Sequence, residues 1–355
     1  MAATKGRRRS RSDRPAHDSP AAIPVGGAAR KLPDLPGHLR IASCIDGVVE
    51  RTEGTAALNA ALARKGATTW ADLTGPTPEQ VAEITRHLGL HELIAEDILE
   101  GNQRSKIEVT DDLIHIVLFV LRFEEEIDRL EVDIVLGEGF LLTVHDAAWD
   151  PHTIPALQTG IAAVMSRGPD HLLWAIVDAI VDGYFPFVDK LGDAIEELQD
   201  SVIANPNPVT LERLFALKTR LLLVRRAATP VREIFNQLTN RELALIDSAE
   251  ILYFRDVYDH LIRLTDELDN YRELVSATLD VYLSTINNQL SLIMKRLTGV
   301  TVVLTGIAAI GGIFGMSEAG TALGGKEAAG FWLVTAFSVI LALTMAWVLR
   351  RIGWI

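Results

Sequence analysis

The chain has 355 residues, of which 48% are hydrophobic and 23% are charged, a balance close to the average of soluble proteins. This composition excludes a collagen, a chain that is disordered throughout and a protein built mostly of lipid-facing helices. The single cysteine excludes a disulfide framework, and a net charge of −13 with 6% aromatic residues argues against specific binding of nucleic acid.

The first 36 residues have a composition of their own. Lys and Arg dominate residues 5–14, and Ala, Ser, Pro and Gly fill the stretch that follows, without any apolar periodicity. Such a segment cannot bury enough apolar surface to fold. We expect residues 1–36 to form a disordered basic tail that lies non-specifically against anionic lipid or RNA.

Residues 37–168 are predicted to form a cytoplasmic α/β domain with a mixed sheet. Apolar and β-branched runs predict strands at 39–49, 69–73, 113–123, 130–136 and 140–145. Helices are expected at 56–64 and from Thr77 to about His87. Thr77 is a favourable N-cap residue, and the proline and glutamate that follow it are typical of a first helical turn.

Residues 169–296 are predicted to form a helical stalk. Apolar residues recur every three or four positions over 174–202, and the proline-containing segment 205–208 then breaks the pattern. A second helix is expected over 209–238, with a kink at Pro230.

A third helix is expected to begin near Asp247, because no glycine or proline follows until Gly299. This helix can continue into an uncharged stretch at 297–316, and a second uncharged stretch covers 331–349. Each stretch can cross about 30 Å of hydrocarbon at about 1.5 Å per residue. We interpret residues 297–355 as a region of two transmembrane helices, the alternative being two buried core helices.

The charges that flank these two stretches predict their orientation. Lys295 and Arg296 precede the first stretch, Arg350 and Arg351 follow the second, and the loop between them has a single basic residue. Basic residues concentrate on the cytoplasmic side of a membrane protein. Both termini are therefore expected in the cytoplasm, in a multi-pass protein of the cell inner membrane or plasma membrane.

One face of the third helix is polar over much of its length. A soluble coiled coil would place Leu or Ile at positions spaced alternately four and three apart. Here these positions form what we call the polar stripe: Asp280, Ser284, Asn287, Ser291, Met294, Thr298, Thr301, Thr305, Ala308 and Gly312. Polar groups inside a bilayer are costly unless they meet one another or water. The polar stripe therefore indicates either a polar channel along a bundle axis or the tight packing of small and hydroxyl residues.

Four segments of the sequence carry a family resemblance. They read HELIAEDILEGNQRSKIE at 91–108, YFRDVYDHLIRLTDELDNYRELV at 253–275, YLSTINNQLSLIMKRLT at 282–298 and GIFGMSEAG at 312–320. Together they resemble the CorA family of magnesium and divalent-cation channels, and the resemblance covers about residues 40–355. It implies a homopentamer with a cytoplasmic funnel, in which five copies of the third helix line the pore and the second uncharged stretch forms an outer ring.

The resemblance also implies an ion and a selectivity site. In that family a Gly-Met-Asn tripeptide holds hydrated magnesium at the outer mouth, and the matching residues here are Gly315, Met316 and Ser317. Serine lacks the reach and the donor of the carboxamide, so unchanged magnesium selectivity does not follow from the scaffold. Zinc-transporting members depart from the tripeptide at its middle residue, which this chain keeps. An Asp280 ring, repeated by symmetry, would concentrate cations.

The implied function is a channel that moves divalent cations inward down the electrochemical gradient. Magnesium is the expected ion, as cargo and as regulator, with cobalt and nickel next; no organic cofactor is expected. The alternatives are a zinc or transition-metal transporter of the same fold and a non-conducting membrane scaffold or sensor. An enzyme is not expected, because the sequence has no Walker loop, no Gly-x-Ser-x-Gly and no HExxH motif.

The family's regulatory cation sites lie between the soluble domains of neighbouring subunits. By resemblance they fall on Asp97 and Asp256, and a second, weaker site falls on Glu96 and Asp182. Two carboxylates repel each other unless a cation lies between them, so low internal magnesium would free the funnel to open. The alternative is a set of ordinary surface acids in a chain with 47 acidic residues.

Overall fold

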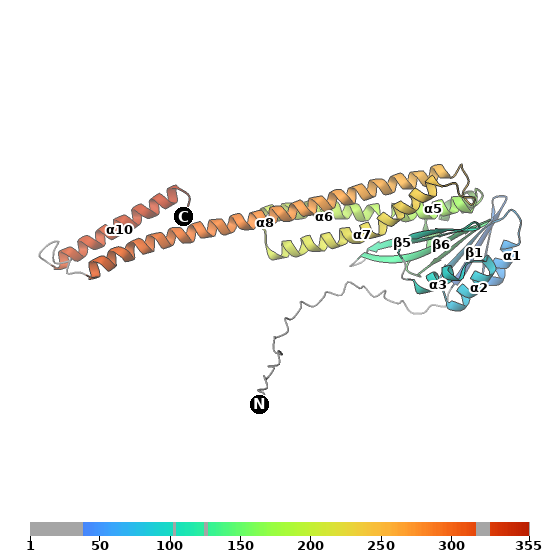
Figure 1. The fold of residues 1–355 in the computed structure, drawn as a ribbon, viewed down its shortest axis with the longest axis horizontal. Helices are drawn as coiled ribbons and strands as arrows, with labels where there is room; N and C mark the ends of the chain where they lie inside the picture. The colour runs from blue at the N-terminus through green and yellow to red at the C-terminus, as the bar shows by residue number, and fades with distance from the viewer. Residues whose placement is uncertain (1–37, 102–103, 124–126, 317–326, 355) are drawn as a thin grey trace, which may run out of the picture. The chain divides into compact units, whose positions relative to one another are not determined.

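The computed structural model describes residues 38–354 except 102–103, 124–126 and 317–326. The predicted basic tail and Ser317 lie outside these residues. Within them, an α/β part comes first along the chain and long helices follow (Figure 1). An α/β domain ahead of long carboxyl-terminal helices is the fold class that the sequence predicts.

Seven strands form one sheet in the order β2-β1-β3-β7-β6-β5-β4. All neighbours are antiparallel except β3 and β7, so the sheet is mixed, as predicted. The strands are β1 (His38–Ile45), β2 (Val48–Glu53), β3 (Thr68–Thr74), β4 (Lys106–Val109), β5 (Leu113–Phe123), β6 (Ile127–Gly137) and β7 (Phe140–His145).

The prediction of a single strand at 39–49 is wrong. The segment is a hairpin, in which β1 and β2 are joined by Asp46 and Gly47 with φ angles of 49° and 77°. An Asp-Gly pair with two positive φ angles is the favoured two-residue hairpin turn, because its twist matches that of the strands.

Helices cover both faces of the sheet. On one face lie α1 (Thr55–Leu62), α2 (Pro78–Leu88) and α3 (Glu92–Glu100), whose apolar residues share a core with β1, β3 and β7. Thr77 forms the expected cap of α2, as part of a capping box with Gln80. On the other face lie α4 (Pro155–Met165) and α5 (Pro169–Asp182), in a core that continues into the long helices.

The helical part contains α6 (Phe185–Ala204), α7 (Pro208–Asn240), α8 (Ile251–Met316) and α10 (Glu327–Arg351). The predicted pattern at 174–202 is not one helix, because α5 ends at Asp182 and α6 begins at Phe185. The predicted break at 205–208 separates α6 from α7, and α7 continues through Pro230.

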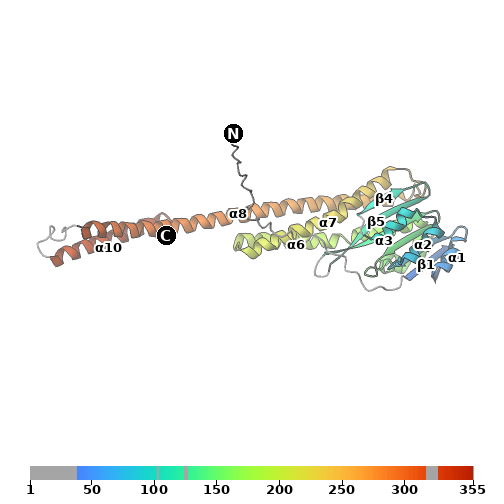
Figure 2. The ribbon, with the colours of Figure 1, turned by 60° about the horizontal axis from the view of Figure 1, so that its bottom comes forward.

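The helix α8 has two differently covered halves. From Ile251 to Tyr282 it packs against α6 and α7, and its apolar residues lie in the core (Figures 1 and 2). From Leu283 to Gly312 most side chains are exposed in the single chain. At the start of this half Ile286 still packs against the core, and further along the cover comes from α10, which packs against α8 near Gly306.

Two stretches of the described chain are long and apolar enough to cross a membrane: Pro169–Ala204 and Ile251–Gly312. In the first, 56% of the most apolar window is buried inside the protein, as expected for core helices, whereas in the second only 6% is buried. The exposed apolar stretch of α8 therefore has the surface of a membrane-spanning helix.

Candidate ion-conduction and cation-binding sites

The polar stripe lies on a part of the α8 surface that its own chain leaves uncovered. Every member from Asp280 to Gly312 is exposed. Between Asn287 and Gly312, the covered residues lie on another face and are Gly299, Val303, Gly306 and Ile310. At about 100° per residue, that face is roughly 130° around the helix from the centre of the polar stripe.

Hydroxyl groups of the polar stripe bond back to their own helix. Ser291 Oγ donates to the Asn287 carbonyl oxygen at 2.9 Å, and Thr301 Oγ1 donates to the Leu297 carbonyl oxygen at 2.8 Å. These bonds use the hydroxyl hydrogens and leave the oxygen lone pairs as acceptors. An array of acceptor oxygens suits the hydrogen atoms of water molecules around a cation. Beyond the stripe, Gly315 and Met316 form the end of α8.

The predicted regulatory residues Asp182 and Asp256 lie on either side of one imidazole. His260 Nδ1 is 3.6 Å from Asp182 Oδ1, and His260 Nε2 is 3.9 Å from Asp256 Oδ2. Both carboxylates are more than half exposed, at 59% and 68%. The two residues come from α5 and α8, so the packing of these helices assembles the group.

Sequence reasoning missed Asp178 and His260, which complete this group. Carboxylate oxygens of Asp178 and Asp182 and a nitrogen of His260 all lie within 4.8 Å of one another. Burial raises the pKa of Asp178 to about 6, and repulsion by the Asp182 carboxylate acts in the same direction. The signal was present in the sequence, because Asp178 and Asp182 are four apart on one helix and Asp256 and His260 are four apart on the other.

Asp97 is engaged in its own chain. It lies on α3, and its Oδ2 accepts a hydrogen bond of 2.5 Å from Lys106 Nζ, which also donates to Glu108 Oε1 at 2.8 Å. Glu96, its neighbour on α3, is exposed. Asp97 and Asp256 thus have different partners within one chain.

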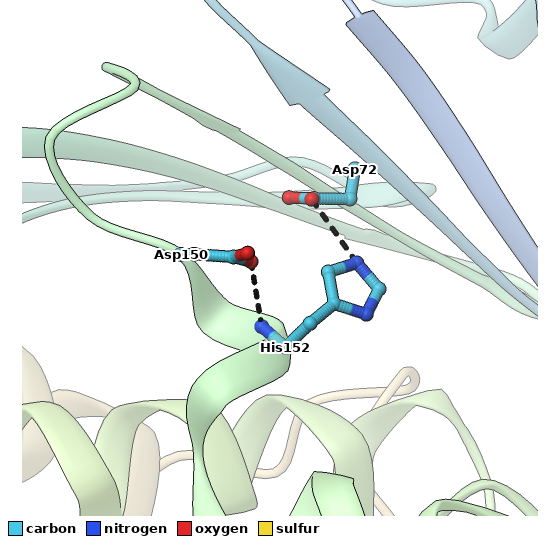
Figure 3. A group of neighbouring side chains, drawn as sticks. All are labelled: Asp72, Asp150 and His152. Carbon is cyan, nitrogen blue, oxygen red and sulfur yellow. Dashed lines mark hydrogen bonds and ion pairs between the residues drawn. The ribbon is translucent and has the colours of Figure 1, made fainter.

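A buried polar cluster around Asp72 was also missed. The Asp72 carboxylate accepts hydrogen bonds from Thr143 Oγ1 at 2.5 Å and from His145 Nε2 at 3.0 Å. Arg40 donates to Asp72 at 2.8 Å and to Asp150 at 2.7 Å. In Figure 3, the His152 ring points from the loop before α4 toward Asp72, with its Nε2 3.2 Å from Oδ2.

Arg40 and hydrogen-bonding side chains already surround the carboxylates of this cluster. Burial alone would raise the pKa of Asp72, but the hydrogen bonds from His145, His152 and Thr143 outweigh it and hold the pKa below its usual range. The Arg40 guanidinium lies between the two carboxylates, where a cation would have to displace it. We therefore interpret the cluster as a structural one, whose hydrogen bonds and ion pairs hold the loop before α4 against the sheet.

Comparison with known proteins gives the family. The model of the CorA-like Mg2+ transporter protein family matches residues 65–351. The cobalt/magnesium transport protein CorA of Thermotoga maritima is 32% identical over 256 residues, which cover 70% of this chain and 73% of that protein. The zinc transport protein ZntB of Yersinia pseudotuberculosis is 22% identical over 291 residues, which cover 81% of this chain and 88% of that protein.

The fold agrees with this result. The structure of the CorA magnesium transporter from Methanocaldococcus jannaschii matches with a TM-score of 0.76 at 24% identity, and the match covers 89% of this chain and 98% of that chain. The protein thus belongs to a class of membrane proteins that transport divalent metal cations. More narrowly, the chain belongs to the CorA-like Mg2+ transporter family, the family that its sequence resembles.

Proposed function

We propose that five copies of the chain form a channel that conducts Mg2+ into the cytoplasm, with the polar stripe lining the pore. The main support for this proposal is where the polar stripe lies on α8. It faces away from α10 and from the other helices that pack on α8. In a symmetric assembly, five such faces can meet at one axis while α10 stays outside. We place the assembly in the cell inner membrane or plasma membrane, with both termini in the cytoplasm.

The donor atoms of the polar stripe favour magnesium over zinc as the transported ion. Mg2+ prefers oxygen ligands and gives up its water reluctantly, so a conducting path for it should offer oxygen atoms to a hydrated ion. Rings of Ser284, Asn287, Ser291 and Thr301 would do so, and a ring of Asp280 would attract cations. The stripe holds no histidine or cysteine, the ligands that zinc favours. Zinc remains the second candidate because of the similarity to ZntB.

The outer mouth is proposed at Gly315, Met316 and Ser317. A ring of five serines leaves a wider opening than a ring of asparagines and presents fewer dipoles to the waters of magnesium. We therefore expect Ser317→Asn to raise the preference for magnesium over cobalt or nickel and to strengthen block by cobalt(III) hexaammine. If selectivity and block are unchanged in this variant, a residue other than Ser317 determines the ion selectivity of the outer mouth.

For regulation we propose an inter-subunit cation site of Asp97 and Asp256, with Glu96 and Asp182 as a weaker second site. The exposure of Asp256 and Asp182 supports this proposal, because both carboxylates are available to a neighbouring subunit. Internal Mg2+ bound between the carboxylates would hold the subunits in a closed arrangement. The double variant Asp97→Ala/Asp256→Ala should be less inhibited by millimolar internal magnesium, and an unchanged inhibition curve with normal assembly would exclude the site.

The test of conduction uses purified protein in liposomes. Uptake of magnesium, cobalt, nickel and zinc, measured alone and in competition, identifies the ion and separates a channel from a non-conducting scaffold. Asn287→Leu should reduce uptake by about tenfold or more, because it places an apolar ring in the hydrated path. Gln289→Leu is the matched control, since it makes the same chemical change on an exposed residue about 200° around the helix. Equal uptake by the two variants would contradict the pore assignment.

A further inference from the structure

A group of three metal-ligating side chains lies beside β4, away from the polar stripe. Asp97 comes from α3, Glu108 from β4 and His115 from β5. Glu108 and His115 are directly opposite each other in the β4–β5 register, so their side chains share one face of the sheet. A carboxylate oxygen from each acid and a nitrogen of His115 all lie within 4.8 Å of one another.

His115 is the unusual member of this group because it is fully buried and only half satisfied. Its Nε2 is 2.8 Å from Asp133 Oδ1, and both side chains are nearly inaccessible, at 0% and 6%. Its Nδ1 is buried and has no hydrogen-bond partner among the described residues. Burying such a nitrogen without a partner is unfavourable, so a ligand bound at Nδ1 would stabilise the folded chain.

The contact with Asp133 selects the tautomer that a metal needs. With the proton on Nε2, directed at the Asp133 carboxylate, Nδ1 carries a lone pair. A carboxylate that holds one nitrogen of a histidine while the other nitrogen binds metal is a common arrangement in metalloproteins. Asp133 would therefore act as a positioning residue for His115.

Lys106 occupies the space between the two acids. Its ammonium group donates hydrogen bonds to Asp97 and Glu108. The lysine is thus a charged competitor of any cation at this place. Its side chain is 25% exposed and that of Glu108 is 44% exposed, so the ammonium group can withdraw into solvent on its flexible stem.

We propose that Asp97, Glu108 and His115 bind one divalent transition-metal ion of the zinc, cobalt or nickel class, which displaces the ammonium group of Lys106. Imidazole nitrogen suits these ions, whereas Mg2+ takes oxygen ligands, so the site discriminates against the proposed cargo. Zinc binds its nitrogen and oxygen ligands at about 2 Å, so the three ligand atoms need only small side-chain movements to share one ion. The site is complete within one chain and does not depend on the proposed pentamer.

The test is a Co2+ titration of the purified full-length protein in detergent, followed by the visible absorption of bound cobalt. A His260→Gln/Asp256→Asn background removes the nitrogen donor of the Asp178–Asp182–His260 group and the partner of Asp97 in the proposed magnesium site, and millimolar MgCl2 occupies the remaining sites made of oxygen ligands. Under these conditions we expect one Co2+ per chain. Glu108→Gln should weaken binding by about tenfold or more, and His115→Gln should do the same while keeping an N–H donor for Asp133.

Lys106→Met gives the opposite and more specific result. It removes the competing charge and leaves all three ligands in place, so Co2+ affinity should increase by about tenfold. If Lys106 had only a structural role, its loss would weaken Co2+ binding or leave it unchanged. Glu100→Gln, an exposed acid at the end of α3, is the matched control and should bind as the background does. Lys106→Met and Glu108→Gln carry the test if His115→Gln does not fold. Unchanged binding in Glu108→Gln, or no gain in Lys106→Met, would overturn the site without bearing on magnesium uptake.

Discussion

The two halves of α8 belong to one continuous helix but have opposite surroundings. In the first half, Phe254 and Leu261 are completely buried by α6 and α7, whereas in the second half Leu304 is 61% exposed. The chain therefore supplies the packing partners of the first half, and lipid or further copies of the chain must supply those of the second. One helix thus anchors a folded domain at one end and offers an assembly surface at the other.

The largest expected effect compares two leucines of α8. Leu261→Ala should lower the free energy of unfolding by about 2–5 kcal/mol, because it leaves a cavity among α6, α7 and α8. Leu304→Ala should change it by about 0.5 kcal/mol or less. The measurement is chemical denaturation of the full chain in detergent, followed by the fluorescence of the buried Trp70. Similar losses for both variants would contradict the division of α8 into two halves.

A smaller effect on the free energy of unfolding is expected when two glycines are changed to alanine. Gly192 lies on α6 and packs against α8, and Gly306 lies within α8 itself. Gly192→Ala, on α6, would place a methyl group on the Tyr271 hydroxyl and should cost about 1–3 kcal/mol. At Gly306 a Cβ atom would lie 3.5 Å from Met345 Sδ, which is ordinary contact. Gly306→Ala should therefore be neutral or stabilise the helix by up to about 1 kcal/mol. Denaturation of both variants measures the difference, and a destabilised Gly306→Ala would show that the second half is packed more tightly than described.

The smallest effect concerns Asp178, which lies beside the covered half of α8. Because the pKa of this carboxyl is raised from 3.8 to about 6 in the folded chain, the folded state holds the proton more tightly than the unfolded state. Well below pH 3.8 both states are protonated and the group contributes nothing; stability falls as the pH rises from about 3.8 to about 6 and is then constant.

In chelator-treated buffer, Asp178→Asn should therefore stabilise the protein at pH 8 and have a much smaller effect at pH 4. We expect about 1 kcal/mol at pH 8, since the half-buried side chain is partly screened by solvent. Thermal unfolding at the two pH values measures the effect. A gain of equal size at both would indicate a cause other than ionisation.

Local patterns were enough to predict much of the α/β part. The strands β5 and β7 begin and end at the predicted residues, because each is a mostly apolar run bounded by charged or glycine residues. The hairpin at Asp46 and Gly47 was overlooked because the residues on both sides are strand-like. The short elements α3 and β4 were missed since charged side chains interrupt their patterns.

The sites divide in a similar way. The polar stripe belongs to one helix, so its residues can be predicted from their spacing alone. The side of the molecule that it faces could not be predicted, because this depends on how α10 packs against α8. The group at His260 combines two helices, and the pair of His115 and Asp133 combines two strands. Which residues of different elements become neighbours depends on the register and the packing, which no local pattern contains.

The continuity of α8 also has a mechanical consequence. The helix runs for 66 residues and has no glycine before Gly299, so it is a stiff rod about 100 Å long. By simple leverage, a tilt of about 5° at the Ile251 end displaces the other end by about 9 Å at the same rise per residue. A change of a few degrees among the helices at the base is therefore magnified along the rod, and stiffness alone can connect the two ends without a relay of side chains.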